Sequence, residues 1–460
     1  MSEKSFDDIF SAFEEISNNY KRENQYFDIL YDSESSVIIT KTRTSENIIA
    51  NAKKTGIVAR TFTGTWKETT TTDFADIKKI TKKLPKVSNM GKDLIEFEGW
   101  SLNKEIKPKI NPLGVPIDEK VQKIRDIYDY ASKFDERIIN AQVRYMERFT
   151  ERIFFNNEGC QLRQVIPRSI LYIIPIAKEG SIADYDYYVD SGEIGFEIFD
   201  KINNKKLDEI CQKSLDMLKA ELPPSGKYPV ILDPSMTGVV AHESFGHGLE
   251  ADQVIRERSY LKHHLNKKVA SDICTICDSP AIEHPVGSYF FDDEGIKAGK
   301  NVLVENGVLK NFIYDRRTAS ILNATPQGNG RRESFAHPIH PRMTNTYFEP
   351  GDYTLDEMIK EIKYGVLLIH SYFGMEDPLG GAMQNTAKKG YLIENGEKTK
   401  VLKAVTLSGR VLEVLPKIDA ISNDPTKFGG GTCGKGSEDH IPVGDGGSYT
   451  RIKEALVSPG

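Results

Sequence analysis

The stretch VVAHESFGHGLEAD, residues 239–252, contains the side chains with the clearest catalytic chemistry in the chain. His242 and His247 could bind a metal ion, and Glu243 directly follows the first histidine. In zinc hydrolases, a glutamate at that position takes a proton from the attacking water. The common zinc pattern is H-E-x-x-H, but here one extra residue separates the histidines. The stretch is therefore either a metal site with an insertion or an ordinary helix that carries two histidines.

The spacing of the two histidines predicts an irregular helix. Each helical residue turns by about 100°, so a spacing of four leaves two side chains about 40° apart, and a spacing of five about 140°. A regular helix cannot aim the second arrangement at one ion. A π-bulge would absorb the extra residue, and Gly246 and Gly248, on either side of His247, tolerate such a distortion.

A catalytic zinc site needs a third protein ligand and one open position. Glu250 and Asp252 follow the histidines closely. Cys433 is the other candidate, in FGGGTCGKGSEDHIPVGDGG, where many glycines allow the backbone to turn tightly and approach another element. A nearby dication would stabilise its thiolate. The residues alone leave these alternatives open, and a small buried cysteine in a turn is the simpler reading of Cys433.

The composition restricts the class of protein. The chain has 460 residues, 28% charged residues and a net charge of −6, without a strongly basic run. We therefore expect no nucleic-acid partner and no membrane partner. No apolar run approaches the roughly 20 residues of a membrane helix. The acidic N-terminus lacks the pattern of a secretory signal, and five cysteines do not make a disulfide framework, so we expect a cytoplasmic protein.

The pattern of apolar residues predicts an α+β protein with two domains. In residues 1–222, helices expected at 4–22, 121–134 and 204–222 alternate with short antiparallel strands, and 85–116 looks like a connection. Pro223 and Pro224 end the last helix and mark the boundary. Residues 223–460 predict a domain of large mixed or antiparallel sheets with one metal-binding helix at 235–249. The motif ENG, at 305–307 and 394–396, predicts two hairpin turns.

Four segments of the second half resemble one known family. HESFGHGLEAD is similar to the H-E-x-x-x-H-G-L-E-x-D signature of the TldD/PmbA metallopeptidases, on the metal-carrying TldD side. GSYFFDDEGIKAGKNVLVENGVLKNFIYDRRTA, GNGRRESFAHPIHPRMTNTYF and GTCGKGSEDHIPVG resemble further segments of the family, in the family's order. The resemblance covers essentially the whole second half, whereas the first half matches only in size and rough pattern.

The resemblance implies a function and a set of residue roles. It places the metal ligands on His242, His247 and Cys433 and the catalytic glutamate on Glu243, with one Zn²⁺ per chain. It implies a zinc-dependent peptidase that hydrolyses unfolded peptides or small proteins. It also implies a dimer, either with itself or with a metal-free paralogue, whose first domain contributes to dimerisation and encloses the substrate. The family has also been described as modulators of DNA gyrase, which the charge balance does not support as direct DNA contact.

Two alternatives to a peptidase of this family remain at the level of sequence. Dipeptidyl peptidase III also spaces its histidines by five, but it is larger and uses a glutamate as third ligand. A non-catalytic, chaperone-like subunit that binds peptides is a different class, and intact His242, Glu243 and His247 count against it. The donor that stabilises the oxyanion is left open among His337, His340, His370 and Tyr372.

Overall fold

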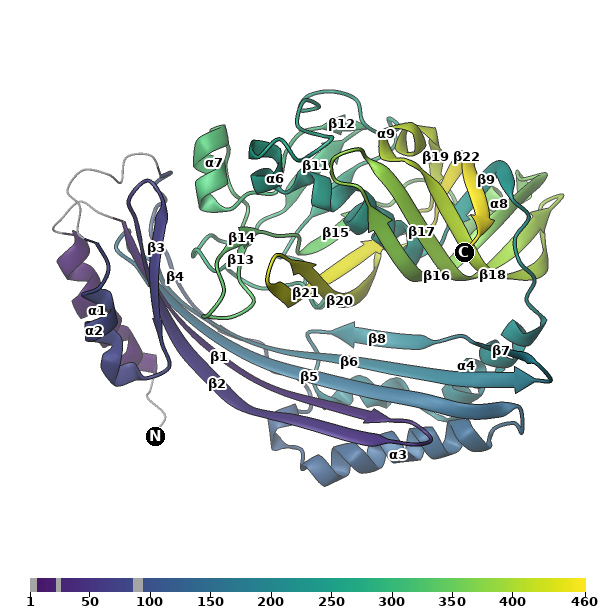
Figure 1. Ribbon diagram of the computed structural model, residues 1–460, viewed down its shortest axis with the longest axis horizontal. Helices are drawn as coiled ribbons and strands as arrows, with labels where there is room; N and C mark the ends of the chain where they lie inside the picture. Colours follow the sequence, from purple (N-terminus) through teal and green to yellow (C-terminus); the bar gives the residue numbers. More distant parts are fainter. Residues whose placement is uncertain (1–5, 22–25, 86–93) are drawn as a thin grey trace.

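The structure of the protein is a computed structural model, and it describes residues 6–21, 26–85 and 94–460. Its elements confirm the α+β class, with helices beside three large sheets (Figure 1). Residues 86–93 of the expected connection, and residues 4, 5 and 22 of the first expected helix, lie outside the described part.

The first half of the chain forms one long, curved sheet of eight strands. Its strands, in spatial order, are β3 (Trp66–Thr71), β2 (Glu46–Phe62), β1 (Phe27–Lys41), β5 (Ile138–Asn156), β6 (Gln161–Glu179) and β4 (Ser101–Glu105), with β7 (Ile182–Tyr185) and β8 (Tyr188–Gly192) also paired to β6. The central strands pair antiparallel, as predicted. Strand β1 is longer than the short strands that the sequence predicted, because a bulge between Glu34 and Ser36 lets it continue through a polar stretch.

Helices cover one face of this sheet, and the second half of the chain lies over the other (Figure 1). The helices of the first half are α1 (Phe6–Lys21), α2 (Ile77–Thr81), α3 (Ile117–Lys133) and α4 (Asn204–Asp216), with 3₁₀ turns η1 (Phe74–Asp76), η2 (Pro112–Gly114), η3 (Phe196–Lys201) and η4 (Met217–Lys219). Apolar side chains of α3, α4 and η3 pack on Val143, Tyr145 and Leu171 of β5 and β6. The helix expected to reach residue 222 ends as α4 and η4, since Ala220 is already extended.

The second half of the chain builds two six-stranded sheets. One contains β12 (Val308–Leu309), β11 (Asn301–Glu305), β10 (Ile276–Asp278), β15 (Asn345–Phe348), β21 (Glu438–Gly447) and β20 (Lys427–Lys435). The other contains β18 (Glu397–Arg410), β17 (Ala382–Glu394), β16 (Tyr364–Glu376), β9 (Gly226–Leu232), β22 (Thr450–Pro459) and β19 (Ile418–Ile421), and a further pairing of β18 with β22 closes it on itself. A short hairpin pairs β13 (Gly330–Arg331) with β14 (His340–Pro341).

Both predicted ENG hairpin turns are confirmed. Asn306 and Gly307 join β11 to β12, and Asn395 and Gly396 join β17 to β18, all four with positive φ. An asparagine followed by a glycine in that conformation is typical of the two-residue turn that matches strand twist.

Short helical segments join these sheets and bear the histidines. They are α5 (Pro234–Val239), the π-helix η5 (Val240–Gly246), η6 (His247–Leu249), α6 (Ala251–Ile255), α7 (Arg316–Leu322), α8 (Leu355–Lys360), α9 (Val411–Val414) and η7 (Leu415–Lys417). Val240, Phe245 and Leu249 are buried in the largest apolar core with Val230 and Leu368 of the closed sheet. The histidine segment is therefore anchored in this apolar core.

In the described part of the chain, no helix has both the length and the apolar character needed to cross a membrane.

Candidate metal centre

The histidine segment is a π-helix, as the five-residue spacing predicts. It spans Val240–Gly246 and continues directly from α5, whose first turn is capped by the side chain of Asp233 on the amide of Met236, 2.9 Å away. The amide of His247 donates to the carbonyl of His242, a five-residue hydrogen bond. The widened turn brings the two imidazole rings to the same side, with centroids 5.2 Å apart.

The glycines beside His247 do not serve the backbone distortion for which the sequence analysis expected them. Gly246 has an ordinary helical φ of −61°, so the distortion does not need its conformational freedom. Space decides instead: a Cβ on Gly246 would lie 2.0 Å from Sδ of Met343, and one on Gly248 would lie 2.9 Å from the Tyr260 ring. These glycines let the helix pack closely against neighbouring segments.

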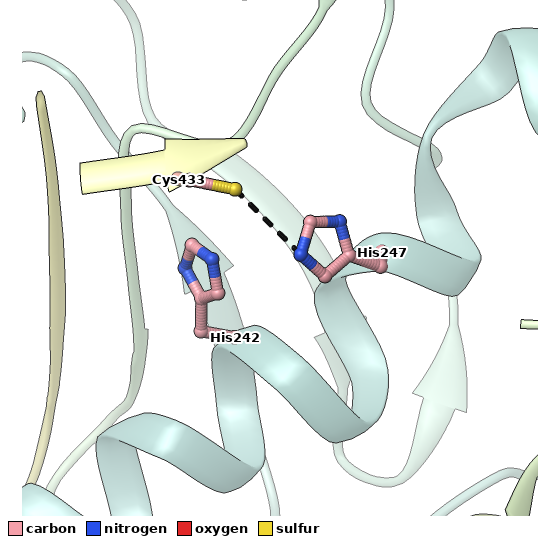
Figure 2. Close-up of side chains that lie close together, drawn as sticks. All are labelled: His242, His247 and Cys433. Carbon is pink, nitrogen blue, oxygen red and sulfur yellow. Dashed lines mark hydrogen bonds between the residues drawn. The ribbon is translucent and has the colours of Figure 1, made fainter. Parts of the chain in front are cut away.

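Cys433 reaches the same point from a strand far away in the sequence. It lies in β20, where it pairs with Ile441 of β21, and its side chain is buried. Its Sγ is 3.6 Å from Nε2 of His247. One donor atom each of His242, His247 and Cys433 lies within 4.8 Å of the others, and Figure 2 shows the three side chains converging.

The two acidic alternatives for the third ligand lie elsewhere. Glu250 approaches the other ring nitrogen of His247, Nδ1, at 3.6 Å. Its carboxylate also accepts a hydrogen bond from Nζ of Lys435 at 3.0 Å, and Asp252 pairs with the same ammonium at 2.7 Å. Cys433, rather than either acid, completes the cluster of donors.

The charges in the cluster stabilise one another. Burial alone would raise the pKa of Cys433, but the imidazoles of His242 and His247 lower it to about 4. Burial would conversely lower the pKa of both imidazoles, yet contacts with Cys433 raise it, helped at His247 by Glu250. A metal ion binds a thiolate and neutral imidazoles. A dication that binds here would therefore displace the protons that the two imidazoles hold beside the thiolate.

Glu243 lies beside these donors and remains partly accessible. Its Oε2 is 3.7 Å from Nε2 of His247, and its side chain is 34% exposed, whereas His242 is buried. Strand β16 passes close by because residue 374 is glycine: a Cβ there would lie 2.8 Å from Cγ of Glu243. The carboxylate thus borders the cluster and is more exposed than the donors themselves.

The sequence did not single out two other acids near this site. Glu376 of β16 is half-buried, and its burial raises its pKa to about 8, against the lowering effect of His247. Burial also raises the pKa of Asp445 in β21, against the lowering effect of His242. Asp445 lies in the glycine-rich stretch around Cys433, whereas Glu376 belongs to no motif, and the sequence gives no sign that either carboxyl group approaches the histidines.

The four candidates for stabilising an oxyanion differ in their contacts and in their exposure. Nδ1 of His370 lies 2.7 Å from Oδ1 of Asp186, and its ring lies against Tyr187, so it joins the two halves of the chain. Nδ1 of His337 bonds Oγ of Ser334 at 2.9 Å. Burial lowers the pKa of His340. Tyr372 is 61% exposed.

The fold and the donor set define a class of protein, an α+β protein with a candidate metal site of two histidines and a cysteine beside a glutamate. Comparison with known sequences gives the family. The pattern of the PmbA/TldA metallopeptidase C-terminal domain matches residues 225–458, and that of the central domain matches residues 110–219. The chain belongs to the TldD/PmbA metallopeptidase family, as its motifs predicted.

Relatives at moderate identity carry metalloprotease names. A metalloprotease of Methanocaldococcus jannaschii is 40% identical over 80% of this chain and 81% of its own length. A metalloprotease TldD homolog of Buchnera aphidicola (subsp. Acyrthosiphon pisum) is 32% identical over 98% and 95%. A zinc metalloprotease TldD homolog of Saccharolobus solfataricus is 32% identical over 73% and 76%. These names show that the chain is related to proteins named as metalloproteases.

Solved structures share the fold. A candidate modulator of a DNA gyrase from Thermotoga maritima superposes with a TM-score of 0.80 at 21% identity, covering 98% of this chain and all of that one. TldE from Thermococcus kodakarensis superposes with a TM-score of 0.75 at 18% identity, covering 97% and 100%. At these identities the likeness concerns the fold alone.

Proposed function

We propose that the protein is a zinc-dependent peptidase that hydrolyses unfolded peptides or small proteins, with one Zn²⁺ per chain and Glu243 as general base. The observation that carries this proposal is the cluster itself. Three donor atoms from His242, His247 and Cys433 lie within 4.8 Å of one another, and a carboxylate lies 3.7 Å from one of them.

The residues present fit a zinc ion. Imidazole nitrogen and thiolate sulfur are ligands that zinc prefers, and three protein ligands leave the open position of a catalytic site. When bound, the ion supplies Lewis acidity towards water and a peptide carbonyl.

Glu243 performs the proton transfers in this proposal. Its position at the accessible edge of the cluster lets it take a proton from the attacking water and later give it to the leaving amine. His242, His247 and Cys433 cannot take that role in this proposal, because their donor atoms would hold the ion. Cys433 donates more charge than a third imidazole would, which favours slow processing over bulk digestion.

The proposed substrate is an extended peptide. Among the described strands, β20 lies at the end of its sheet, and Cys433 is part of it. The outer edge of such a strand offers backbone groups to an added strand, which gives affinity with little sequence preference.

We also propose that the chain forms a dimer, either with itself or with a metal-free paralogue. Light scattering of the purified chain, alone and with that paralogue, distinguishes the two.

The decisive experiment replaces Glu243 and keeps the metal. Glu243→Gln should retain zinc, measured by elemental analysis, while cleavage of an unfolded peptide falls by about 10²–10⁴-fold. Glu257→Gln, on the exposed Glu257 of the same region, is the matched control and should cleave normally. Full activity of Glu243→Gln with zinc bound would remove Glu243 from the chemistry, and peptide binding without cleavage by the wild type would favour a chaperone-like subunit.

A further inference from the structure

A small cavity between the two halves of the chain is lined by an unusual number of guanidinium groups. It measures about 40 Å³ and lies between the face of β5 and β6 that meets the second half and the segments around β13 and β21. Five arginines border it: Arg148, Arg152, Arg168, Arg331 and Arg332. No part of the proposed metal chemistry uses these side chains.

Two of the arginines face each other across neighbouring strands. Arg148 of β5 pairs directly with Arg168 of β6, an arrangement that destabilises a sheet when both side chains are charged. Arg168 donates to the carbonyls of Val286 and Ser288, each at 2.7 Å, and to Oγ1 of Thr150 at 3.1 Å. Arg168 forms no ion pair within 4.0 Å among the described residues, although the carboxylate of Glu193 is near enough to oppose the lowering of its pKa by burial.

The opposite wall contributes two more guanidinium groups that lack full compensation. Arg331 donates to the carbonyls of Met343 and Pro442, and it forms no ion pair within the described residues. Arg332 reaches Glu68 at 3.2 Å through Nη2, but its Nε and Nη1 are buried and have no hydrogen-bond partner in the described structure.

Acidic side chains around the cavity compensate two of its five arginines. Glu34 lies 3.5 Å from Arg148, and Asp293 pairs with Arg152 and accepts a hydrogen bond from the amide of Arg332. The carboxylate of Asp292 accepts hydrogen bonds from the amides of Gly330 and Ile296, at 2.8 and 2.9 Å. The carboxylate of Glu333 accepts hydrogen bonds from two backbone amides of β21. Arg168 and Arg331 therefore remain without an ion pair among the described residues, and Arg332 has unused donors.

A buried guanidinium group without a carboxylate partner lowers the stability of the fold. Removing a guanidinium from water costs several kcal/mol unless an opposite charge compensates it. In agreement, burial lowers the pKa of Arg168 to about 10, and burial also lowers the pKa of Arg331 and Arg332. A bound anion would supply the missing charge and the missing hydrogen-bond acceptors.

We propose that this cavity binds a small free oxyanion, of the class of inorganic phosphate, between Arg168, Arg331 and Arg332. The volume suits such an ion, since one water needs only about 10–15 Å³. Arginine forms strong, charge-assisted hydrogen bonds to phosphate and carboxylate. A free ion is favoured over the carboxylate end of a peptide because both halves of the chain wall the cavity.

The site would connect the two halves of the protein beside the candidate metal centre. Ile441 and Pro442, which line the cavity, pair with Cys433 and Thr432 across the β20–β21 hairpin. Arg148 and Arg168 belong to the first half, and Arg331 and Arg332 to the second. The ion would therefore stabilise the junction that supports the hairpin, whether or not the protein is a peptidase.

The test is thermal unfolding of the full chain in increasing inorganic phosphate at constant ionic strength. Once the site is saturated, the midpoint should rise by about 1–2 °C for each tenfold increase in phosphate. Phosphate also stabilises proteins non-specifically, so a control variant is essential. Arg125→Gln, on the exposed Arg125 that pairs with Glu46, should keep the full response.

Two variants at the site make the test decisive. Arg168→Gln should lose the phosphate response. Thr150→Glu, which adds a carboxylate between Arg148 and Arg168, should be more stable than wild type without phosphate and respond little to it; this variant is informative even if Arg168→Gln folds poorly. Equal responses in all variants, or none in wild type, would overturn the proposal. So would stabilisation by a free-acid peptide, but not by phosphate or by the amidated peptide, since it would assign the arginines to substrate.

Discussion

Oε2 of Glu250 lies 3.6 Å from Nδ1 of His247, while Nε2 of the same ring lies 3.6 Å from Sγ of Cys433. The imidazole is thus held between a carboxylate on one side and the donor cluster on the other. A carboxylate on the second nitrogen fixes the orientation and tautomer of a ligating histidine. Lys435 and Arg342 in turn hold the carboxylate, at 3.0 and 3.9 Å.

Glu250→Gln should therefore weaken zinc binding without removing a ligand. Loss of such a supporting group typically reduces metal affinity by about 10–100-fold. Competition with a chromophoric chelator measures the affinity. Asp252→Asn is the matched control, because Asp252 pairs with the same Lys435 but belongs to no contact with His247. Equal losses in the two variants would assign the effect to Lys435 instead.

Cys433→Ala should abolish stoichiometric zinc binding, because it deletes the one sulfur donor of the cluster. Cys277→Ala removes a buried thiol of β10 that lies outside the cluster and should keep its zinc. Elemental analysis after dialysis against metal-free buffer gives both values. Unchanged zinc in Cys433→Ala would mean that another group supplies the third ligand.

The shape of the π-helix depends on the absence of a side chain at residue 246. Gly246→Ala should lower the free energy of unfolding by about 1–3 kcal/mol, because its Cβ meets Sδ of Met343 in a packed core. Gly114→Ala, where a Cβ meets nothing within 4 Å, should change stability little. Denaturant titration provides the comparison. A neutral Gly246→Ala would show that Met343 can move aside freely.

Burial raises the pKa of Glu294 to about 7, although Arg60 opposes the shift. A carboxyl group whose pKa is raised in the folded state binds more protons there than in the unfolded chain. Its contribution to stability is complete below the ordinary pKa of the group and is lost as the pH rises through 7. The loss amounts to roughly 3 kcal/mol at most.

Glu294→Gln should accordingly flatten the fall in stability between pH 5 and 8, relative to wild type. Unfolding midpoints in denaturant across this range test it, with Glu413→Gln at an exposed position as control. A parallel pH profile in Glu294→Gln and wild type would refute this role.

Local patterns predicted much of this structure. The spacing of His242 and His247 predicted a π-helix, and the two ENG motifs predicted hairpins, because short-range geometry decides each. The convergence of Cys433 with the histidines came from resemblance, since nothing local links a residue of β20 to a helix almost two hundred positions earlier.

Other features depend on contacts that no short pattern encodes. The strand β1 continues through a polar stretch because it pairs on both sides with β2 and β5. Glu250 looked like a possible ligand from its position in the sequence, but the short turn after His247 directs it to the far side of the ring. The need for glycine at 246 comes from Met343, which is far away in the chain.

The central claim is that two imidazoles and one thiolate bind the same ion. X-ray absorption spectroscopy of the zinc-loaded chain tests it most directly. We predict one sulfur at about 2.3 Å from zinc and two nitrogens at about 2.0–2.1 Å, with one further light atom. A spectrum without sulfur in the first coordination shell would contradict the assignment of Cys433 and the metal site built on it.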